Sequence, residues 1–153
     1  MKFKKLHGNN KLKKVDISII PYEQKYRGDM LFCFLAAKDA IATGYASDKV
    51  HGLYLKDDLL DIGANYIQCG DVFYLAIDRR DRVVGMLGTK TVSPTDLWLK
   101  RFFVKPELKG QGIGSKLLAV VEKYAADKGI TTVHTRFADS YLEAARFYSA
   151  KGL

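Results

Sequence analysis

The stretch that decides how this sequence folds is residues 104–118, which read Val104-Lys105-Pro106-Glu107-Leu108-Lys109-Gly110-Gln111-Gly112-Ile113-Gly114-Ser115-Lys116-Leu117-Leu118. Its three glycines alternate between the end of an apolar run and the start of a segment with helical periodicity. Glycine has no Cβ, so backbone N–H groups can converge on one point there. Because these donors coincide with the positive end of a helix dipole, the stretch predicts an anion site, most simply for phosphate. Lys109 and Lys116 are expected at its rim.

The stretch matches neither of the two common phosphate-binding motifs. A P-loop requires G-x-x-x-x-G-K-[ST], whereas here Ser115 precedes Lys116 outside that frame. A dinucleotide fingerprint requires G-x-G-x-x-G in an early strand–helix–strand unit, whereas this spacing is G-x-G-x-G and comes late in the chain. A glycine-rich turn without a ligand is the structural alternative.

The segments that surround the glycines predict a mixed α/β domain. Alternating or β-branched runs predict strands over residues 15–20, 72–78, 83–92, 97–104 and 131–137. Helical spacing predicts helices over residues 22–40, 113–128 and 140–150, with Pro21 ending the first strand and Gly129 ending the second helix. Residues 41–70 indicate only short helical or looped structure.

This order of elements fixes the expected topology. The early strands follow one another through short polar turns, which favours antiparallel pairing. Residues 97–137 form a strand, a helix and a strand, and such a unit pairs its strands in parallel through a right-handed crossover. We therefore expect an α/β fold with a mixed, mostly antiparallel sheet and a central parallel βαβ unit.

The charge of the chain is concentrated at its start. There are 25 Lys and Arg against 17 Asp and Glu, a formal net charge of +8. Residues 1–14 hold six lysines and no acid, so residues 15–153 carry only +2. We expect a basic arm over residues 1–14 and a single domain over 15–153. Nucleic-acid binding by the arm is a weak hypothesis, because Phe3 is its only aromatic residue that could stack on a base.

The apolar runs and the cysteines of the sequence bear on membrane attachment, metal binding and cellular location. The longest dense apolar run, residues 30–37, is far shorter than the roughly 20 residues that span a bilayer. Because no apolar stretch follows the first lysines, we expect no signal peptide. Cys33 and Cys69 lack the spacing of a zinc site, so we expect no metal and two buried free thiols. A reducing, cytoplasmic location without membrane attachment follows as an expectation.

Two motifs together resemble the GNAT N-acetyltransferase superfamily. The glycine stretch is similar to its acetyl-CoA loop, [Arg/Gln]-x-x-Gly-x-[Gly/Ala] after a strand that ends in Val-x-Pro, with Lys109 in place of Arg or Gln. Residues 144–153 resemble a second signature, A-x-x-F-Y-x-x-x-G-[Phe/Leu]. The resemblance covers residues 15–153 and implies a GNAT-like acyl-CoA N-acyltransferase fold with acetyl-CoA as cosubstrate.

The resemblance also implies which residues hold the cosubstrate. The pyrophosphate is expected on the backbone N–H groups of the loop, and the pantetheine arm on the main chain at the end of the preceding strand. The residues concerned are Phe103, Val104, Lys109, Gly110, Gln111, Gly112, Ile113, Gly114 and Ser115. The backbone N–H of Val104 is the expected donor to the oxyanion.

Catalysis is expected to be direct attack of a primary amine on the thioester in a ternary complex. Tyr148 stands where the family's acid tyrosine lies and is expected to protonate the leaving thiolate; a purely structural role in an amphipathic helix is its alternative. Asp96, the only acid near the central strand, is the expected general base, with turn capping as its alternative. His134 is interpreted as a structural strand residue.

The acceptor and the partners are less determined. A small-molecule or peptide amine is expected, and Asp48, Asp57, Asp58 and Asp61 would attract a cationic one unless they form only a solvated acidic face. Relatives continue beyond the position of Leu153 through one or two strands, so we expect a shortened or a naturally short form lacking the last strands. Its open sheet edge would favour a homodimer or aggregation. A non-catalytic acyl-CoA-binding regulatory module is the alternative to an enzyme.

Overall fold

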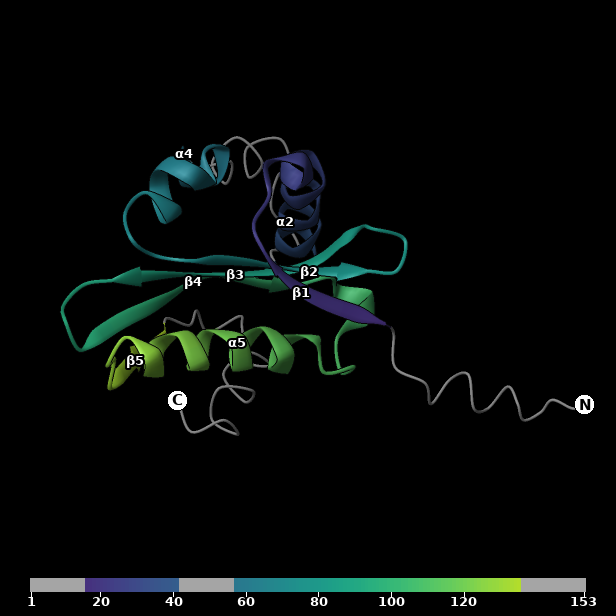
Figure 1. Cartoon of the computed structure of the whole chain (residues 1–153). Helices are drawn as coiled ribbons and strands as arrows, with labels where there is room; N and C mark the ends of the chain where they lie inside the picture. Colours follow the sequence, from purple (N-terminus) through teal and green to yellow (C-terminus); the bar gives the residue numbers. More distant parts are fainter. Residues whose placement is uncertain (1–15, 42–56, 136–153) are drawn as a thin grey trace, which may run out of the picture.

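The computed structural model describes residues 16–41 and 57–135, and a five-stranded sheet forms its centre (Figure 1). The strands lie in the order of the sequence: β1 (Ile17–Pro21), β2 (Phe73–Asp78), β3 (Val83–Thr91), β4 (Asp96–Val104) and β5 (Thr132–His134). All neighbours are antiparallel except β4 and β5, which are parallel. The predicted mixed, mostly antiparallel sheet with a parallel βαβ unit is confirmed.

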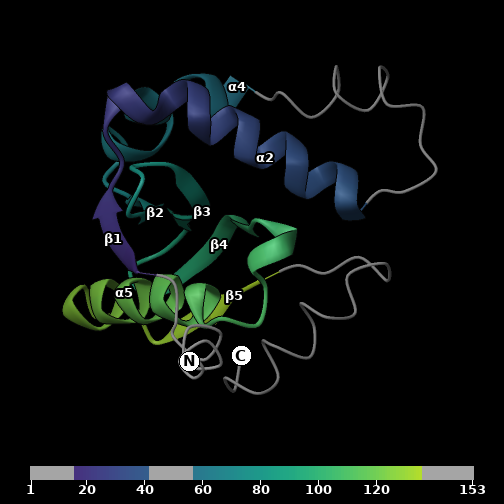
Figure 2. The ribbon, with the colours of Figure 1, turned by 90° about the vertical axis from the view of Figure 1, so that its right-hand side faces the viewer.

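Helices cover both faces of this sheet (Figures 1 and 2). One face carries α2 (Arg27–Ile41) and the short α4 (Asp57–Leu60), followed by a π-helical turn over Gly63–Ile67. The opposite face carries α5 (Ile113–Asp127). We call these the α2 face and the α5 face of the sheet.

Each face has its own buried apolar cluster. The α2 face packs on a cluster that includes Met30, Phe34, Leu59, Tyr66, Phe73 and Met86. The α5 face packs on a cluster that includes Leu87, Leu97, Leu99, Leu117, Leu118 and Val121. Because the side chains of a strand alternate between faces, β4 is fixed between both layers. The strand that precedes the glycine loop is therefore rigidly held.

The structure corrects several predicted boundaries. Pro21 lies within β1 rather than after it, which the sheet tolerates because β1 is an edge strand. The first helix begins at Arg27 instead of residue 22, after a 3-10 turn over Gln24–Tyr26. The described part of the last strand ends at His134. The prediction of two buried thiols is half wrong, because Cys33 is buried and Cys69 is exposed.

Some expectations fall on residues that the structure does not describe. These are the lysine-rich arm, the helix over residues 140–150 and the proposed acid Tyr148, which all lie outside the described ranges. Within those ranges, no helix has the length and apolar character needed to cross a bilayer.

Candidate active site

The N-terminus of α5 is the centre of the candidate site. Its first backbone bond runs from the N–H of Lys116 to the carbonyl of Gly112, at 3.0 Å, so the N–H groups just before Lys116 precede the helical ladder. Gly112 occupies the N-cap position and supplies no side-chain hydrogen bond. The positive end of a 15-residue helix is thus left to an external acceptor.

Glycine is required at two positions of this loop. Gly110 and Gly112 have φ angles of 86° and 85°, in the left-handed region that side chains rarely adopt. A Cβ built at either position would meet no atom of the described residues within 4 Å. The loop is therefore open at both glycines, and the space above the backbone is available to a ligand.

The other predicted loop residues divide between the surface and the core. Lys109 is exposed, and Gln111 and Ser115 are half-buried. Ile113 is 2% exposed and packs into the cluster of the α5 face, so it anchors the helix start and offers only its backbone to a ligand. Lys116 is turned away from the expected rim position, with its Nζ 3.5 Å from the carbonyl oxygen of Ile17.

The backbone N–H of Val104 points to the side of β4 that faces β5, not to the side that faces β3. The N–H of Lys105 donates to Val84 of β3 at 2.9 Å, and backbone groups alternate in direction along a strand, so the N–H of Val104 points away from β3. Among the described residues, β5 pairs only with residues 96–98 of β4. By the same alternation the main chain of Phe103, in register with Met86, faces β3.

A β-bulge interrupts β4 three residues before Val104. Register with β3 shifts between Met86 and Gly88, which oppose Phe103 and Lys100, so β4 holds one extra residue there. Arg101 lies in the bulge with a φ of 57°, the left-handed region that non-glycine residues seldom occupy. The bulge directs both Lys100 and Arg101 to the α2 face, where a regular strand would alternate them.

The side chain of Arg101 is bound to elements far away in the sequence. Its Nε and Nη2 donate to the two carboxylate oxygens of Asp58 at 3.0 and 2.8 Å, and Tyr66 donates its hydroxyl to Asp58 at 2.8 Å. The guanidinium also lies over the ring of Phe34, 5.7 Å from its centroid. Burial opposes ionisation of Asp58, but the bonds from Arg101 and Tyr66 outweigh it and lower its pKa. These contacts tie α2 and α4 to the bulge.

Sequence reasoning missed this cluster. Asp58 was expected to attract a cationic amine, but its charge is compensated by Arg101. Asp61, from the same expected group, accepts a hydrogen bond from the N–H of Ala64 at 3.0 Å and so caps the π-helical turn. In the sequence, this ion pair is indicated only by the presence of Arg101 in the central strand and of Asp58 among the aspartates before residue 62. Nothing in the sequence shows that the two residues meet.

Asp96 lies at the opposite end of β4 from the loop. It is eight residues from Val104, or about 26 Å at the usual rise of a strand. Its carboxylate binds His134 Nε2 at 2.8 Å and the hydroxyl of Thr95 at 2.5 Å, and these bonds lower its pKa. The His134 ring stacks on Trp98, with centroids 4.9 Å apart. The carboxylate of Asp96 therefore orients the His134 ring through this hydrogen bond.

Comparison with known proteins places the chain in a family. A model of the acetyltransferase (GNAT) family matches residues 45–153, so the chain belongs to this family. Human N-acetyltransferase 8B is 32% identical over 104 residues, which are 64% of this chain and 45% of the human protein. Bovine thialysine N-epsilon-acetyltransferase is 39% identical over 57 residues, 37% of this chain and 34% of its own length. The chain thus spans about half or less of these two relatives.

Solved structures show the same fold. An acetyltransferase of the GNAT family from Staphylococcus aureus Mu50 superposes with a TM-score of 0.79 at 27% identity, covering 90% of this chain and 84% of that one. The PaiA N-acetyltransferase from Thermoplasma acidophilum, solved in complex with coenzyme A, has a TM-score of 0.74 at 17% identity and covers 88% of both chains. The expected GNAT-like fold is confirmed.

Proposed function

We propose that this chain is an acetyl-CoA-dependent N-acetyltransferase that transfers the acetyl group directly to a primary amine. The observation that carries this proposal is the start of α5, where an uncapped helix N-terminus meets two open glycines in left-handed conformation. Because the chain belongs to the GNAT acetyltransferase family, we assign this anion site to the pyrophosphate of acetyl-CoA. Acetyl-CoA would supply an acyl thioester whose C–S bond breaks as the amine nitrogen bonds to the carbonyl carbon.

The residues of the loop fit a pyrophosphate. The backbone N–H groups from Gly110 to Ser115 would bind its oxygens at the positive end of the helix. The exposed side chain of Lys109 would add a positive charge from the loop. Within residues 16–41 and 57–135, no side chain obstructs the backbone at Gly110 or Gly112.

The strand before the loop fits the pantetheine arm. Val104 directs its N–H toward the β5 side of β4 and lies only five residues before Lys109, which suits a hydrogen bond with the arm in the manner of an added strand. Since the main chain of Phe103 faces β3, we assign this contact to Val104 alone and retain Phe103 as an apolar wall. The pantetheine arm would then continue along β4 from Val104 toward the bulge at Arg101. We place the thioester of acetyl-CoA beside this bulge.

Proton transfer is assigned to two side chains. His134 donates from Nε2 to the carboxylate of Asp96, which leaves Nδ1 as the ring nitrogen that can accept the proton of the amine. His134 is in register with Trp98, three residues before Arg101, so the proton would travel from the amine to Nδ1 along a chain of waters. Asp96 is then a positioning residue rather than the base expected from the sequence. Tyr148 remains the proposed acid for the leaving thiol, on the family's signature alone.

A pair of matched glycine substitutions tests the loop. Gly112→Ala and Gly129→Ala impose the same backbone strain, because the two φ angles are 85° and 80° and neither Cβ would come within 4 Å of an atom in the part of the chain that the structure describes. Both should lose about 1 kcal/mol of stability. Titration calorimetry with CoA should show at least tenfold weaker binding for Gly112→Ala and wild-type binding for Gly129→Ala. Equal CoA affinity in the two variants would reject the loop assignment.

A further inference from the structure

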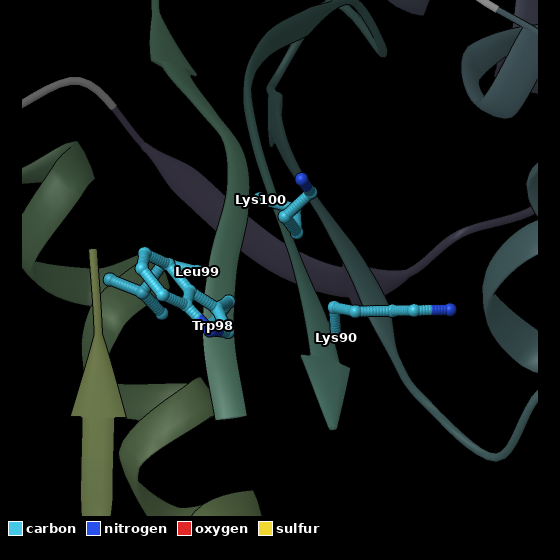
Figure 3. A pocket seen from close by; sticks show the side chains of 4 residues that line it. All are labelled: Lys90, Trp98, Leu99 and Lys100. Atoms are coloured by element: carbon cyan, nitrogen blue, oxygen red, sulfur yellow. The ribbon is translucent and has the colours of Figure 1, made fainter. Parts of the chain in front are cut away.

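A shallow pocket lies on the α2 face of the sheet beside the bulge (Figure 3). Its volume is about 190 Å³, and it is lined by Lys90, Trp98, Leu99 and Lys100. Figure 3 shows the two lysine side chains leaving neighbouring strands, with the indole of Trp98 directed toward β5. The pocket therefore combines an aromatic wall with two cations, directly before the residue that forms the bulge.

The two lysines are close enough to share one ligand. Lys90 stands opposite Trp98 in the β3–β4 ladder, and Lys100 stands opposite Gly88. Lys90 and Lys100 are thus diagonal neighbours on one face, whose Cα atoms are separated by roughly 7–8 Å in an antiparallel pair. Long, flexible side chains at that spacing can both reach a single carboxylate or phosphate group.

Their charges are not compensated within the described ranges. The side chain of neither lysine takes part in an ion pair or a hydrogen bond to any residue in 16–41 or 57–135. Three acidic side chains of the same part of the fold bind other groups: Asp58 pairs with Arg101, Asp96 accepts a hydrogen bond from His134, and Asp71 accepts from the hydroxyl groups of Thr89 and Thr91. The ammonium groups of Lys90 and Lys100 are therefore left to pair with an anionic ligand.

We propose that this pocket binds an anionic group of the acceptor, so that the amine acetylated by the enzyme belongs to a molecule that also carries a carboxylate or a phosphate. This inference rests on the proposed function and names the substrate class of the same site. Lys90 and Lys100 bind the anion, and Trp98 contacts the apolar part of the molecule. The amine then extends toward the bulge at Arg101.

The same charges favour the chemistry of transfer. A primary amine must lose its proton before it can attack a thioester, and nearby cations disfavour the protonated form. Because Lys90 and Lys100 neutralise the anionic group of the acceptor, that group does not hold the amine in its protonated form. A cluster of free carboxylates, as the sequence suggested for Asp58 and Asp61, would have held the amine in its unreactive charged form.

Matched amines test the proposal in the wild-type protein. Leucine is compared with leucinamide, and phosphoethanolamine with ethanolamine, since each pair differs in the anionic group. We expect kcat/KM with acetyl-CoA to be at least tenfold higher for the amine that carries a carboxylate or phosphate than for the matched amine that lacks it. Whichever pair shows the preference tells carboxylate from phosphate. Equal rates for both members of both pairs would overturn the proposal while leaving the acetyltransferase function intact.

A binding readout separates the pocket from catalysis. Trp98 is the only tryptophan of the chain, so its fluorescence reports on this pocket alone. Titration with the preferred anionic amine in the absence of acetyl-CoA should give a saturable change, which the neutral counterpart does not give. A flat titration with all four compounds would count against the pocket.

Charge substitutions complete the test. Lys90→Met and Lys100→Met should each reduce the anionic preference about tenfold, and Lys100→Glu should reverse it. Lys128→Met, at the C-terminal end of α5 on the other face, is the matched control and should change nothing. CoA binding should be the same in all four variants. Retention of the anionic preference in both pocket methionine variants would refute the assignment of the lysines.

Discussion

Removing the charge of Asp58 tests whether the ion pair at the bulge holds the two sides of the site together. Asp58→Asn keeps the size of the side chain and can still accept the hydrogen bond from Tyr66, so the change isolates the pairing with Arg101. The carboxylate and the guanidinium are 26% and 22% exposed. The guanidinium, left over the ring of Phe34, would remain largely out of water without its counter-ion.

The expected loss lies between two limits. Exposed ion pairs contribute about 0–1 kcal/mol, whereas removing one partner of a fully buried pair costs about 3–5 kcal/mol. For this half-buried, bidentate pair we expect a loss of about 2 kcal/mol in the free energy of unfolding. In a domain of this size that corresponds to a fall of about 4–8 °C in Tm. Urea denaturation at pH 7 measures it.

The pH dependence gives a second check on the same pair. The pKa of Asp58 is lowered in the folded protein, so its contribution to stability is fully present above the pKa of the unfolded chain and is lost as pH falls through the folded value. The difference between wild type and Asp58→Asn should therefore be constant from pH 5 to 7 and should shrink below about pH 4.

An exposed pair supplies the control. Asp16 and Arg79 are 3.5 Å apart with both side chains 76% exposed, so Asp16→Asn should change stability by no more than about 0.5 kcal/mol. The reasoning is refuted if Asp58→Asn costs no more than Asp16→Asn, or if its cost does not shrink in acid.

Further predictions concern the core, the thiols and the proposed base. Gly88→Ala would place a Cβ 2.6 Å from the buried ring of Phe73, so we expect a loss of about 1–3 kcal/mol in urea denaturation, and an unchanged midpoint would contradict the packing. Burial raises the pKa of Cys33 to about 12 while Cys69 is exposed, so an aromatic disulfide reagent should label one thiol in the native protein and a second only after unfolding. Rapid labelling of both thiols would be the opposite result. His134→Gln should lower kcat/KM about a hundredfold without changing CoA affinity, whereas an unchanged kcat/KM would exclude His134 as the base.

The glycine loop and the helix after it could be predicted because their signals are local. The left-handed backbone conformation at Gly110 and Gly112 favours glycine at both positions, so the residue type itself indicates the turn. The helix α5 ends within one residue of the predicted position. The strand that precedes them was also predicted nearly to its limits. The order of these elements then restricted the topology to a mixed sheet.

The acceptor side could not be predicted in the same way. Arg101 and Asp58 are 43 residues apart, and only the folded sheet brings them together. Arg101 also adopts a left-handed conformation that its residue type gives no reason to expect. The bond between Asp96 and His134 joins two strands 38 residues apart, which is why each of them was assigned a role separately from the sequence.

The most direct test of the account is release of free thiol from acetyl-CoA across a panel of primary amines. The account predicts amine-dependent release well above hydrolysis, with one acetylated amine formed for each thiol. CoA binding at the loop without thiol release for any amine would contradict it and would indicate a non-catalytic acyl-CoA-binding module.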